Sequence, residues 1–155
     1  MAGFRIRQIP ETIANQARET LRSPQYGHPA HVEVATGYGP CRLCLHTFNQ
    51  GSENRILFTY NPFEGLDSYP SPGPIFIHEE KCSPYSAVNE FPADLRNLKL
   101  VFEAYGPERQ LVLQERIRDR AVEAAIARMF DQATVEYIHV RNEEAGCFIV
   151  HIERA

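Results

Sequence analysis

The chain has 155 residues, of which 43% are hydrophobic and 23% are charged, and these values are typical of an ordinary globular protein. They exclude a disordered tail, and no run approaches the roughly 18 apolar residues of a membrane span. The formal net charge is −4 and neither half of the chain is basic, so the positive stripe that nucleic-acid binding requires is missing. We therefore expect no nucleic-acid partner and no membrane partner.

The N-terminal segment predicts a cytoplasmic protein. Arg5 and Arg7 are followed by Glu11, Asn15 and Gln16, where a signal peptide would need an apolar region. Because cytosolic thiols stay reduced, we interpret the cysteines as free thiols or ligands rather than as disulfides. They are Cys41, Cys44, Cys82 and Cys147.

The sequence of the first half of the chain predicts one helix, with one strand before it and three strands after it. Phe4 to Arg7 alternate between apolar and basic residues, which indicates a short strand. Ile13, Ala17 and Leu21 recur every four residues, which predicts a helix over residues 10–21. Residues 41–48 and 55–60 then predict two strands joined by a turn-rich segment. Residues 61–74 are rich in proline and predict a long loop before a strand at 75–78.

The second half predicts two hairpins separated by a helix. After a loop over residues 82–92, alternation over 98–105 and 109–115 predicts the first hairpin, with a turn at Gly106 and Pro107. Apolar residues at helical spacing predict a helix over residues 119–131, and residues 134–141 and 147–153 predict the closing hairpin. The prediction is an α+β fold, with two main helices on a mostly antiparallel sheet of about seven strands. We expect a single globular domain over residues 1–155.

The register of the closing hairpin predicts which side chains share a face. Ile138 and Val140 share one face of the first strand, and Phe148, Val150 and Ile152 share one face of the second. These apolar sets lie on the same side of the sheet only if paired positions add up to an even number. We therefore expect Arg141 to pair with Cys147, His139 with Ile149, and Tyr137 with His151.

The opposite face would then gather Tyr137, His139, Arg141, Cys147 and His151. A guanidinium beside a thiol favours the thiolate, and His139 would lie diagonal to Cys147 at about 7–8 Å between α-carbons. This pattern predicts an activated cysteine or an anion-binding patch. The alternative is a plain solvated face, which antiparallel sheets commonly have.

Three pairs of thiols and imidazoles raise the question of zinc, which takes both as ligands. They are Cys41 with Cys44, His78 with Cys82, and Cys147 with His151. If residues 41–48 form a strand, residues three apart point to opposite faces, so the first pair cannot chelate unless a turn breaks the strand. In a strand the last pair would lie about 13 Å apart, too far to share one tetrahedral ion easily. We therefore expect no metal, and the sequence identifies no other cofactor.

These blocks together resemble the bacterial family of unknown function numbered 1203. The resemblance runs from about residue 39 to the end of the chain. It is carried by Pro40-Cys41-Arg42, by Tyr69 and the segment Gly73-Pro74-Ile75-Phe76-Ile77-His78-Glu79, and by Tyr137-Ile138-His139-Val140 with Asn142 and Gly146-Cys147-Phe148. It implies a bacterial protein of about this length and implies no activity.

The sequence departs from the family pattern at two positions. Arg141 stands where we expect a second histidine, and Glu103 stands where we expect an arginine. The first departure weakens any scheme that needs paired histidines. The side chains that match the motif blocks are Arg42, His139, Asn142 and Cys147.

Two hypotheses follow, and the sequence does not decide whether the protein is an enzyme. The first is a small-molecule or thiol-based site roofed by the proline-rich loop, with Cys147 as nucleophile or redox thiol and His139 as its base. Arg42, Asn142, Arg141 and Tyr137 would bind a small anionic ligand. The alternative is a non-catalytic binding or structural protein that uses this face to form a homodimer or to dock a partner.

Overall fold

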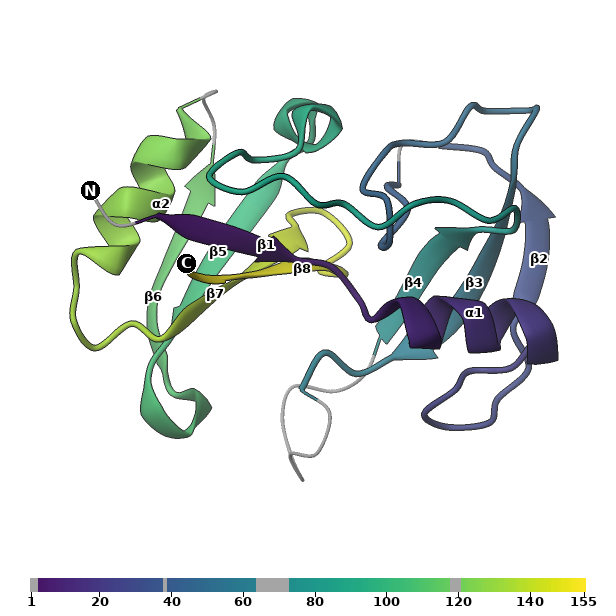
Figure 1. The fold of residues 1–155 in the computed structure, drawn as a ribbon, viewed down its shortest axis with the longest axis horizontal. Coiled ribbons are helices and arrows are strands. Elements are labelled where there is room, and N and C mark those ends of the chain that lie inside the picture. Colours follow the sequence, from purple (N-terminus) through teal and green to yellow (C-terminus); the bar gives the residue numbers. More distant parts are fainter. Residues whose placement is uncertain (1–2, 38, 64–72, 118–120) are drawn as a thin grey trace. The chain divides into compact units, whose positions relative to one another are not determined.

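The structure is a computed structural model, and it describes residues 3–37, 39–63, 73–117 and 121–155. The chain forms two compact units (Figure 1). We call residues 1–8 with 85–155 the terminal unit, and residues 9–84 the cysteine unit. The division into units does not test the single domain expected over residues 1–155, which stays a prediction.

The terminal unit is built on a five-stranded antiparallel sheet in the order β1-β8-β7-β5-β6. Helix α2 packs against β6, and two short 3₁₀ helices, η1 and η2, flank β5. The elements are β1 (Phe4–Arg7), η1 (Ala93–Asn97), β5 (Leu100–Tyr105), η2 (Pro107–Arg109), β6 (Leu111–Ile117), α2 (Val122–Phe130), β7 (Tyr137–Asn142) and β8 (Phe148–Arg154).

Alternating side chains define the two faces of this sheet. In β7 and β8, Ile138, Val140, Val150 and Ile152 are fully buried, as period-two alternation predicts for the core face. Helix α2 contributes Met129 and further apolar residues to the core of the unit. The other face carries the tyrosines and histidines that the sequence places opposite the apolar set.

The cysteine unit holds a three-stranded antiparallel sheet in the order β2-β3-β4, with α1 against β3. Its elements are α1 (Glu11–Thr20), β2 (His31–Val34), β3 (Asn54–Tyr60) and β4 (Gly73–His78). Helix α1 buries Ala14 and Ala17, and it ends at Leu21, which adopts a left-handed conformation with φ 52°. The helix predicted over residues 10–21 is therefore confirmed.

The α+β class and the antiparallel pairing are confirmed, but the expected sheet of about seven strands is wrong. The described residues form eight strands in two separate sheets. One strand that the sequence did not predict, β2, is a four-residue edge strand whose side chains are half-buried or exposed. Gly73 and Pro74, expected in the long loop, begin β4, and residues 64–72 of that loop lie outside the described residues.

The strand predicted over residues 41–48 is also wrong, because this segment is a turn. Pro40 and Thr47 form an isolated bridge, and the backbone N–H of Leu45 donates to the carbonyl of Cys41 at 2.9 Å. All residues from Cys41 to Leu45 are buried, so the segment lacks the alternation of a strand with one solvated face. Leu45 has φ 65°, a left-handed conformation that a strand does not contain.

The register of the closing hairpin differs from the prediction by two residues. His139 pairs with His151 and Tyr137 with Glu153, so the pairing sum stays even and the faces are assigned correctly. A bulge between Val140 and Arg141 then pairs Arg141 with Phe148 instead of Cys147. Phe148 therefore shares a face with His139, not with the apolar set as expected.

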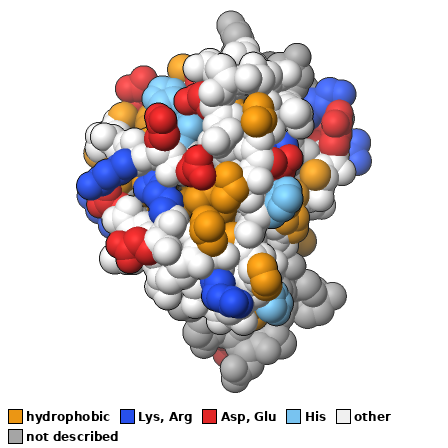
Figure 2. Space-filling model, turned by 90° about the vertical axis from the view of Figure 1, so that its right-hand side faces the viewer, with side chains coloured by type: hydrophobic (Ala, Val, Ile, Leu, Met, Phe, Trp, Pro, Cys, Tyr) orange, Lys and Arg blue, Asp and Glu red, His pale blue; other side chains and the backbone are white. Residues whose placement is uncertain are grey.

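The described surface mixes charges of both signs. On the face drawn in Figure 2, acidic, basic and histidine side chains are interspersed with hydrophobic ones. This distribution matches the balanced composition of 16 basic and 20 acidic residues. None of the described helices combines the length and the apolar character needed to cross a membrane.

Candidate metal centre

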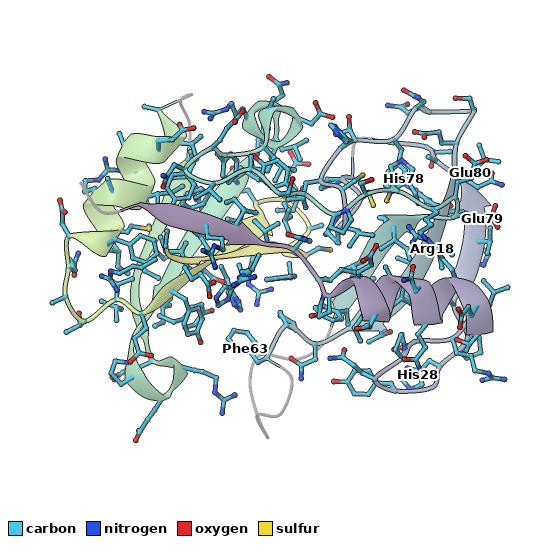
Figure 3. All side chains as sticks on the ribbon, in the orientation of Figure 1. Arg18, His28, Phe63, His78, Glu79 and Glu80 are labelled. Atoms are coloured by element: carbon cyan, nitrogen blue, oxygen red, sulfur yellow. The ribbon has the colours of Figure 1, made fainter. Side chains whose placement is uncertain are left out.

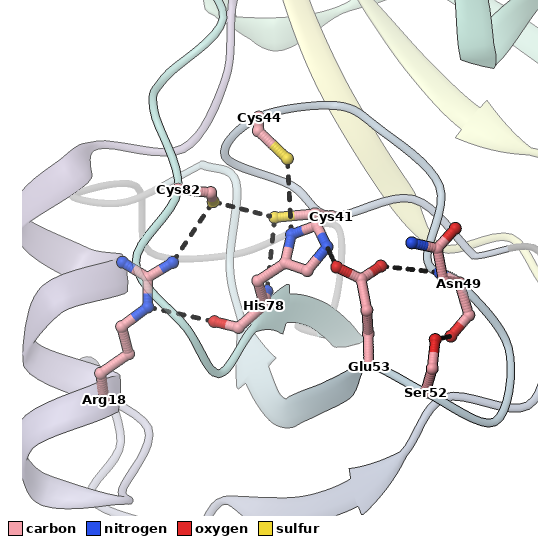
Figure 4. Close-up of polar contacts among 8 residues, drawn as sticks. All are labelled: Arg18, Cys41, Cys44, Asn49, Ser52, Glu53, His78 and Cys82. Atoms are coloured by element: carbon pink, nitrogen blue, oxygen red, sulfur yellow. Dashed lines mark hydrogen bonds and ion pairs between the residues drawn. The ribbon is translucent and has the colours of Figure 1, made fainter.

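Four side chains of the cysteine unit converge at the end of β4. They are Cys41, Cys44, His78 and Cys82, and their potential ligand atoms all lie within 4.8 Å of one another (Figure 4). Cys41, Cys44 and His78 are buried, and Cys82 is half-buried. We call these four residues the cysteine cluster.

The turn at residues 41–48 presents the first two thiols to the same point. The N–H of Cys41 donates to the carbonyl of His46 at 2.9 Å, which closes the turn. The N–H of Cys44 donates to the Cys41 sulfur, and the N–H of His46 donates to the Cys44 sulfur. Leu45 reaches the required backbone path only by adopting φ 65°, a conformation that is costly for a residue with a branched side chain.

The other two cluster residues follow one another closely along the chain. His78 is the last residue of β4, and its backbone N–H donates to the Cys41 sulfur at 3.4 Å. Its Nδ1 lies 3.5 Å from the Cys44 sulfur. Cys82 comes four residues later in an irregular segment, and its sulfur lies 3.8 Å from that of Cys41.

Two charged side chains contact the cluster from outside. Arg18 of α1 lies near His78 (Figure 3). It donates from Nη2 to the Cys82 sulfur at 3.4 Å and from Nε to the carbonyl of His78 at 3.0 Å (Figure 4). Glu53 places Oε2 3.3 Å from Nε2 of His78, while its Oε1 accepts the N–H of Asn49 at 2.7 Å. A carboxylate on the outer nitrogen of a histidine is the arrangement that orients metal-binding imidazoles.

The hydrogen bonds within the cluster favour a negatively charged sulfur. Hydrogen bonds from the thiols of Cys44 and Cys82 hold the pKa of Cys41 far below its ordinary value. Hydrogen bonds to the sulfurs of Cys41 and Cys82 raise the pKa of His78 to about 10. The metal-free cluster is therefore built to hold a thiolate next to an imidazolium, and a cation could replace the protons.

The spacing of the ligand atoms matches a tetrahedral metal site. Sulfurs about 2.3 Å from a zinc ion lie about 3.8 Å from each other at the tetrahedral angle, and a sulfur and a nitrogen lie slightly closer. The observed separations are 3.8 Å between the sulfurs of Cys41 and Cys82, and 3.5 Å between the Cys44 sulfur and Nδ1 of His78. All four cysteines of the chain are free thiols.

The histidine predicted as a base lies on the expected face of the hairpin, but it is enclosed. His139 is 1% exposed, and its Nε2 lies 3.1 Å from Nδ1 of His151. The ring of Tyr137 stacks on His151 with centroids 4.9 Å apart, and Phe148 contacts the His139 ring at 5.0 Å. Burial, together with the nearby charges of His151 and Arg141, lowers the pKa of His139 to about 2.

Arg141 is held by an acidic neighbour. Its Nε donates to Oε1 of Glu103 at 2.6 Å, and its Nη1 donates to the carbonyl of Gly146 at 3.1 Å. The two positions that depart from the family pattern thus form an ion pair with each other. This pairing gives both charges a structural partner on the sheet face.

The remaining predicted site residues have local partners. The thiol of Cys147 contacts the carbonyl of Ala145 at 3.9 Å, and Oδ1 of Asn142 accepts the N–H groups of Glu144 and Ala145. Arg42 belongs to the cysteine unit, where it is buried in the turn and donates to the carbonyl of Pro40. Thiol chemistry and anion binding by these residues stay predictions.

The sequence contained part of the signal for the cysteine cluster. The Cys41–Cys44 and His78–Cys82 spacings are visible in it, but the argument against a shared metal rested on a strand over residues 41–48, and that strand is a turn. Arg18 and Glu53 were not predicted as neighbours of the cluster. Their contribution depends on α1 and the segment before β3 approaching the cluster, which no local spacing indicates.

Comparison with known proteins gives a family and no more. The model of a family described as protein of unknown function (DUF1203) matches residues 38–154, a segment that contains the whole cysteine cluster. No curated protein and no solved structure matches the chain significantly.

Proposed function

The chain belongs to the DUF1203 family of proteins of unknown function, and from the geometry of its cysteine cluster we propose that it is a zinc-binding protein. The ligands are the sulfurs of Cys41, Cys44 and Cys82 and Nδ1 of His78. The observation that carries this proposal is the convergence of these four atoms within 4.8 Å. The separations of these atoms match those of zinc ligands at the corners of a tetrahedron, and a chance cluster of thiols would not need to match them.

The donor set favours zinc over harder cations. Thiolates and imidazoles are soft or borderline ligands, whereas magnesium and calcium take oxygen ligands. Four protein ligands complete the coordination of zinc and leave no position for a substrate or a water molecule, so the centre is structural rather than catalytic. Three thiolates around a divalent ion leave one net negative charge, which the guanidinium of Arg18 offsets.

The proposed zinc ion would link three parts of the cysteine unit: the turn after Pro40, the end of β4 and the segment around Cys82. A unit of residues 9–84 has a small core, and units of this size commonly need a metal or another crosslink. A reducing compartment such as the cytoplasm expected from the sequence would keep the thiols available for zinc.

Metal analysis of the purified protein tests this proposal. We expect about one zinc ion per chain, and cobalt substitution should give the intense visible absorption of a tetrahedral thiolate site. The substitutions Cys41→Ser and His78→Ala should reduce the zinc content. His78→Cys should retain the zinc, because the new thiol takes the place of the imidazole as fourth ligand. Cys147→Ser is the matched control, since Cys147 lies outside the cluster. A wild-type protein with less than about a tenth of a zinc ion per chain would overturn the proposal.

A further inference from the structure

We propose that Cys82 is the ligand at which the zinc centre opens to hydrogen peroxide, forming a Cys41–Cys82 disulfide and releasing the metal. This inference rests on the proposed zinc-binding function and adds a means of regulating it. Three observations carry it: the exposure of the four ligands, the way each ligand is anchored, and the separation of the sulfurs.

Exposure distinguishes Cys82 from the other thiols of the cluster. The relative exposure of Cys41 is 0% and that of Cys44 is 6%, while Cys82 is half-buried. Oxidation of a cysteine by a peroxide requires that the oxidant reach its sulfur. Peroxide therefore meets Cys82 first.

The backbone anchors the other ligands more firmly than it anchors Cys82. Cys41 and Cys44 lie in a turn closed by backbone hydrogen bonds, and His78 is part of a paired strand. Cys82 lies in a segment, residues 81–87, that is neither helix nor strand. Its sulfur is instead contacted by a side chain, Nη2 of Arg18 at 3.4 Å.

The printed distance between the sulfurs of Cys41 and Cys82 indicates the disulfide partner of Cys82. The sulfurs of Cys41 and Cys82 lie 3.8 Å apart, and a disulfide bond of about 2.05 Å needs only a modest movement of the loosely anchored partner. Cys44 contacts Nδ1 of His78 at 3.5 Å, so its sulfur is also held by the imidazole. The expected product therefore joins Cys82 to Cys41.

The reaction balances with peroxide as the two-electron oxidant. The Cys82 thiolate attacks one peroxide oxygen, the O–O bond breaks, and hydroxide leaves and takes a proton from solvent to become water. The Cys41 thiolate then attacks the resulting sulfenic acid at sulfur, and a second hydroxide leaves and is protonated. Two thiolates, one peroxide and two protons thus give one disulfide and two waters. Only Cys44 and His78 would then remain to hold zinc, and two ligands are too few to retain it.

The cleavage sites of trypsin make the disulfide assignment direct. Arg42 lies between Cys41 and Cys44, and Lys81 precedes Cys82, so the three cysteines fall in separate peptides, residues 23–42, 43–55 and 82–96. After oxidation and alkylation, we expect a species that links residues 23–42 to 82–96. A species that links residues 23–42 to 43–55 instead would overturn the assignment of Cys82.

The experiment uses zinc-loaded protein whose metal content has been measured beforehand, so that absence of zinc counts against the proposed function and not against this inference. Peroxide is added with a chromogenic zinc chelator, and we expect zinc release in step with the linked peptide. Retention of zinc in excess peroxide would contradict the inference while leaving the zinc site intact.

Two variants that keep four ligands isolate the role of Cys82. Cys82→His retains a Cys₂His₂ centre but removes the exposed thiol, and we expect zinc release to slow at least about tenfold. His78→Cys retains Cys82 and should release zinc at least as fast as the wild type. Equal rates for Cys82→His and the wild type would overturn the inference, and the peptide map of the wild type decides independently of either variant.

Discussion

Arg18 supports Cys82 in the way that backbone amides support the other two thiols. The sulfur of Cys41 accepts the N–H of His78, and the sulfur of Cys44 accepts that of His46. Cys82 has the guanidinium of Arg18 in the equivalent position, 3.4 Å away. Because Arg18 also binds the His78 carbonyl, one side chain of α1 orients the segment that carries two ligands.

We expect Arg18→Gln to weaken zinc binding by about 10–100-fold, the usual effect of losing a side chain that orients a metal ligand. Glutamine keeps a hydrogen-bond donor but removes the positive charge that balances the three thiolates. Arg18→Lys keeps the positive charge without the forked geometry, so its zinc affinity should lie between those of the wild type and Arg18→Gln. Competition with a zinc chelator measures the affinity. An unchanged affinity in Arg18→Gln would show that the contact is incidental.

Cys147 should react independently of His139. Its thiol contacts the Ala145 carbonyl, and the bulge places Phe148 against the His139 ring. We therefore expect His139→Gln to leave the rate of Cys147 alkylation by iodoacetamide unchanged across the pH range, in zinc-loaded protein whose other thiols are bound. A decrease of tenfold or more would support the thiol–imidazole pair predicted from the sequence.

At the scale of elements, the loop of the closing hairpin determines which residues of β7 and β8 pair with each other. In the hairpin, Asn142 accepts two backbone N–H groups of the loop, and Gly146 takes φ 75°. The bulge follows directly from this loop, because it absorbs the extra residue on β8. The side chains presented on the polar face are therefore selected by the loop as much as by strand alternation.

We expect Asn142→Ala to destabilise the protein by about 1–2 kcal/mol, since two loop N–H groups lose their acceptor. Asn142→Asp keeps the acceptor oxygen and should be close to wild type. Urea unfolding of both variants measures the difference. Equal midpoints for alanine and aspartate would mean that water replaces the side chain at no cost.

The elements were predictable where side chains alternate or recur within one segment. Ile13 and Ala17 placed α1, and the alternation in Phe4 to Arg7 placed β1. The segment from Cys41 to Leu45 was misassigned because a short, mostly apolar run suits a buried strand and a buried turn equally well. Convergence of Cys41 with His78 and Cys82 depends on contacts between residues far apart in the sequence, which spacing alone does not give.

At the scale of the whole molecule, the two units place their polar groups differently. The cysteine unit concentrates them in the proposed zinc centre, whereas the terminal unit buries His139 among aromatic rings on its sheet. The proposed zinc ion would neutralise the thiolates of the first arrangement, whereas the second needs its imidazoles to stay neutral. The stability of the two units should therefore respond to different solution conditions.

Removal of zinc should destabilise the cysteine unit selectively. The metal joins the turn at residues 41–48 to the end of β4, so its loss removes a crosslink from that sheet. Hydrogen exchange before and after chelation measures the effect, and we expect faster exchange in β3 and β4 with little change in β7 and β8. Faster exchange throughout both units would indicate that the zinc centre supports the whole chain.

Acidification should destabilise the terminal unit through its buried histidines. Burial lowers the pKa of His139 from 6.5 to about 2, and burial lowers the pKa of His151 as well. Below pH 6.5 the unfolded state binds a proton at His139 that the folded state does not, so stability is lost as the pH falls. The loss from His139 alone between pH 6.5 and 5 is about 2 kcal/mol.

Hydrogen exchange in β7 and β8 reports on the terminal unit without interference from zinc release. In His139→Gln, the pH dependence of this exchange should become shallower. A wild-type terminal unit equally protected at pH 5 and 7 would show that His139 can charge within the fold.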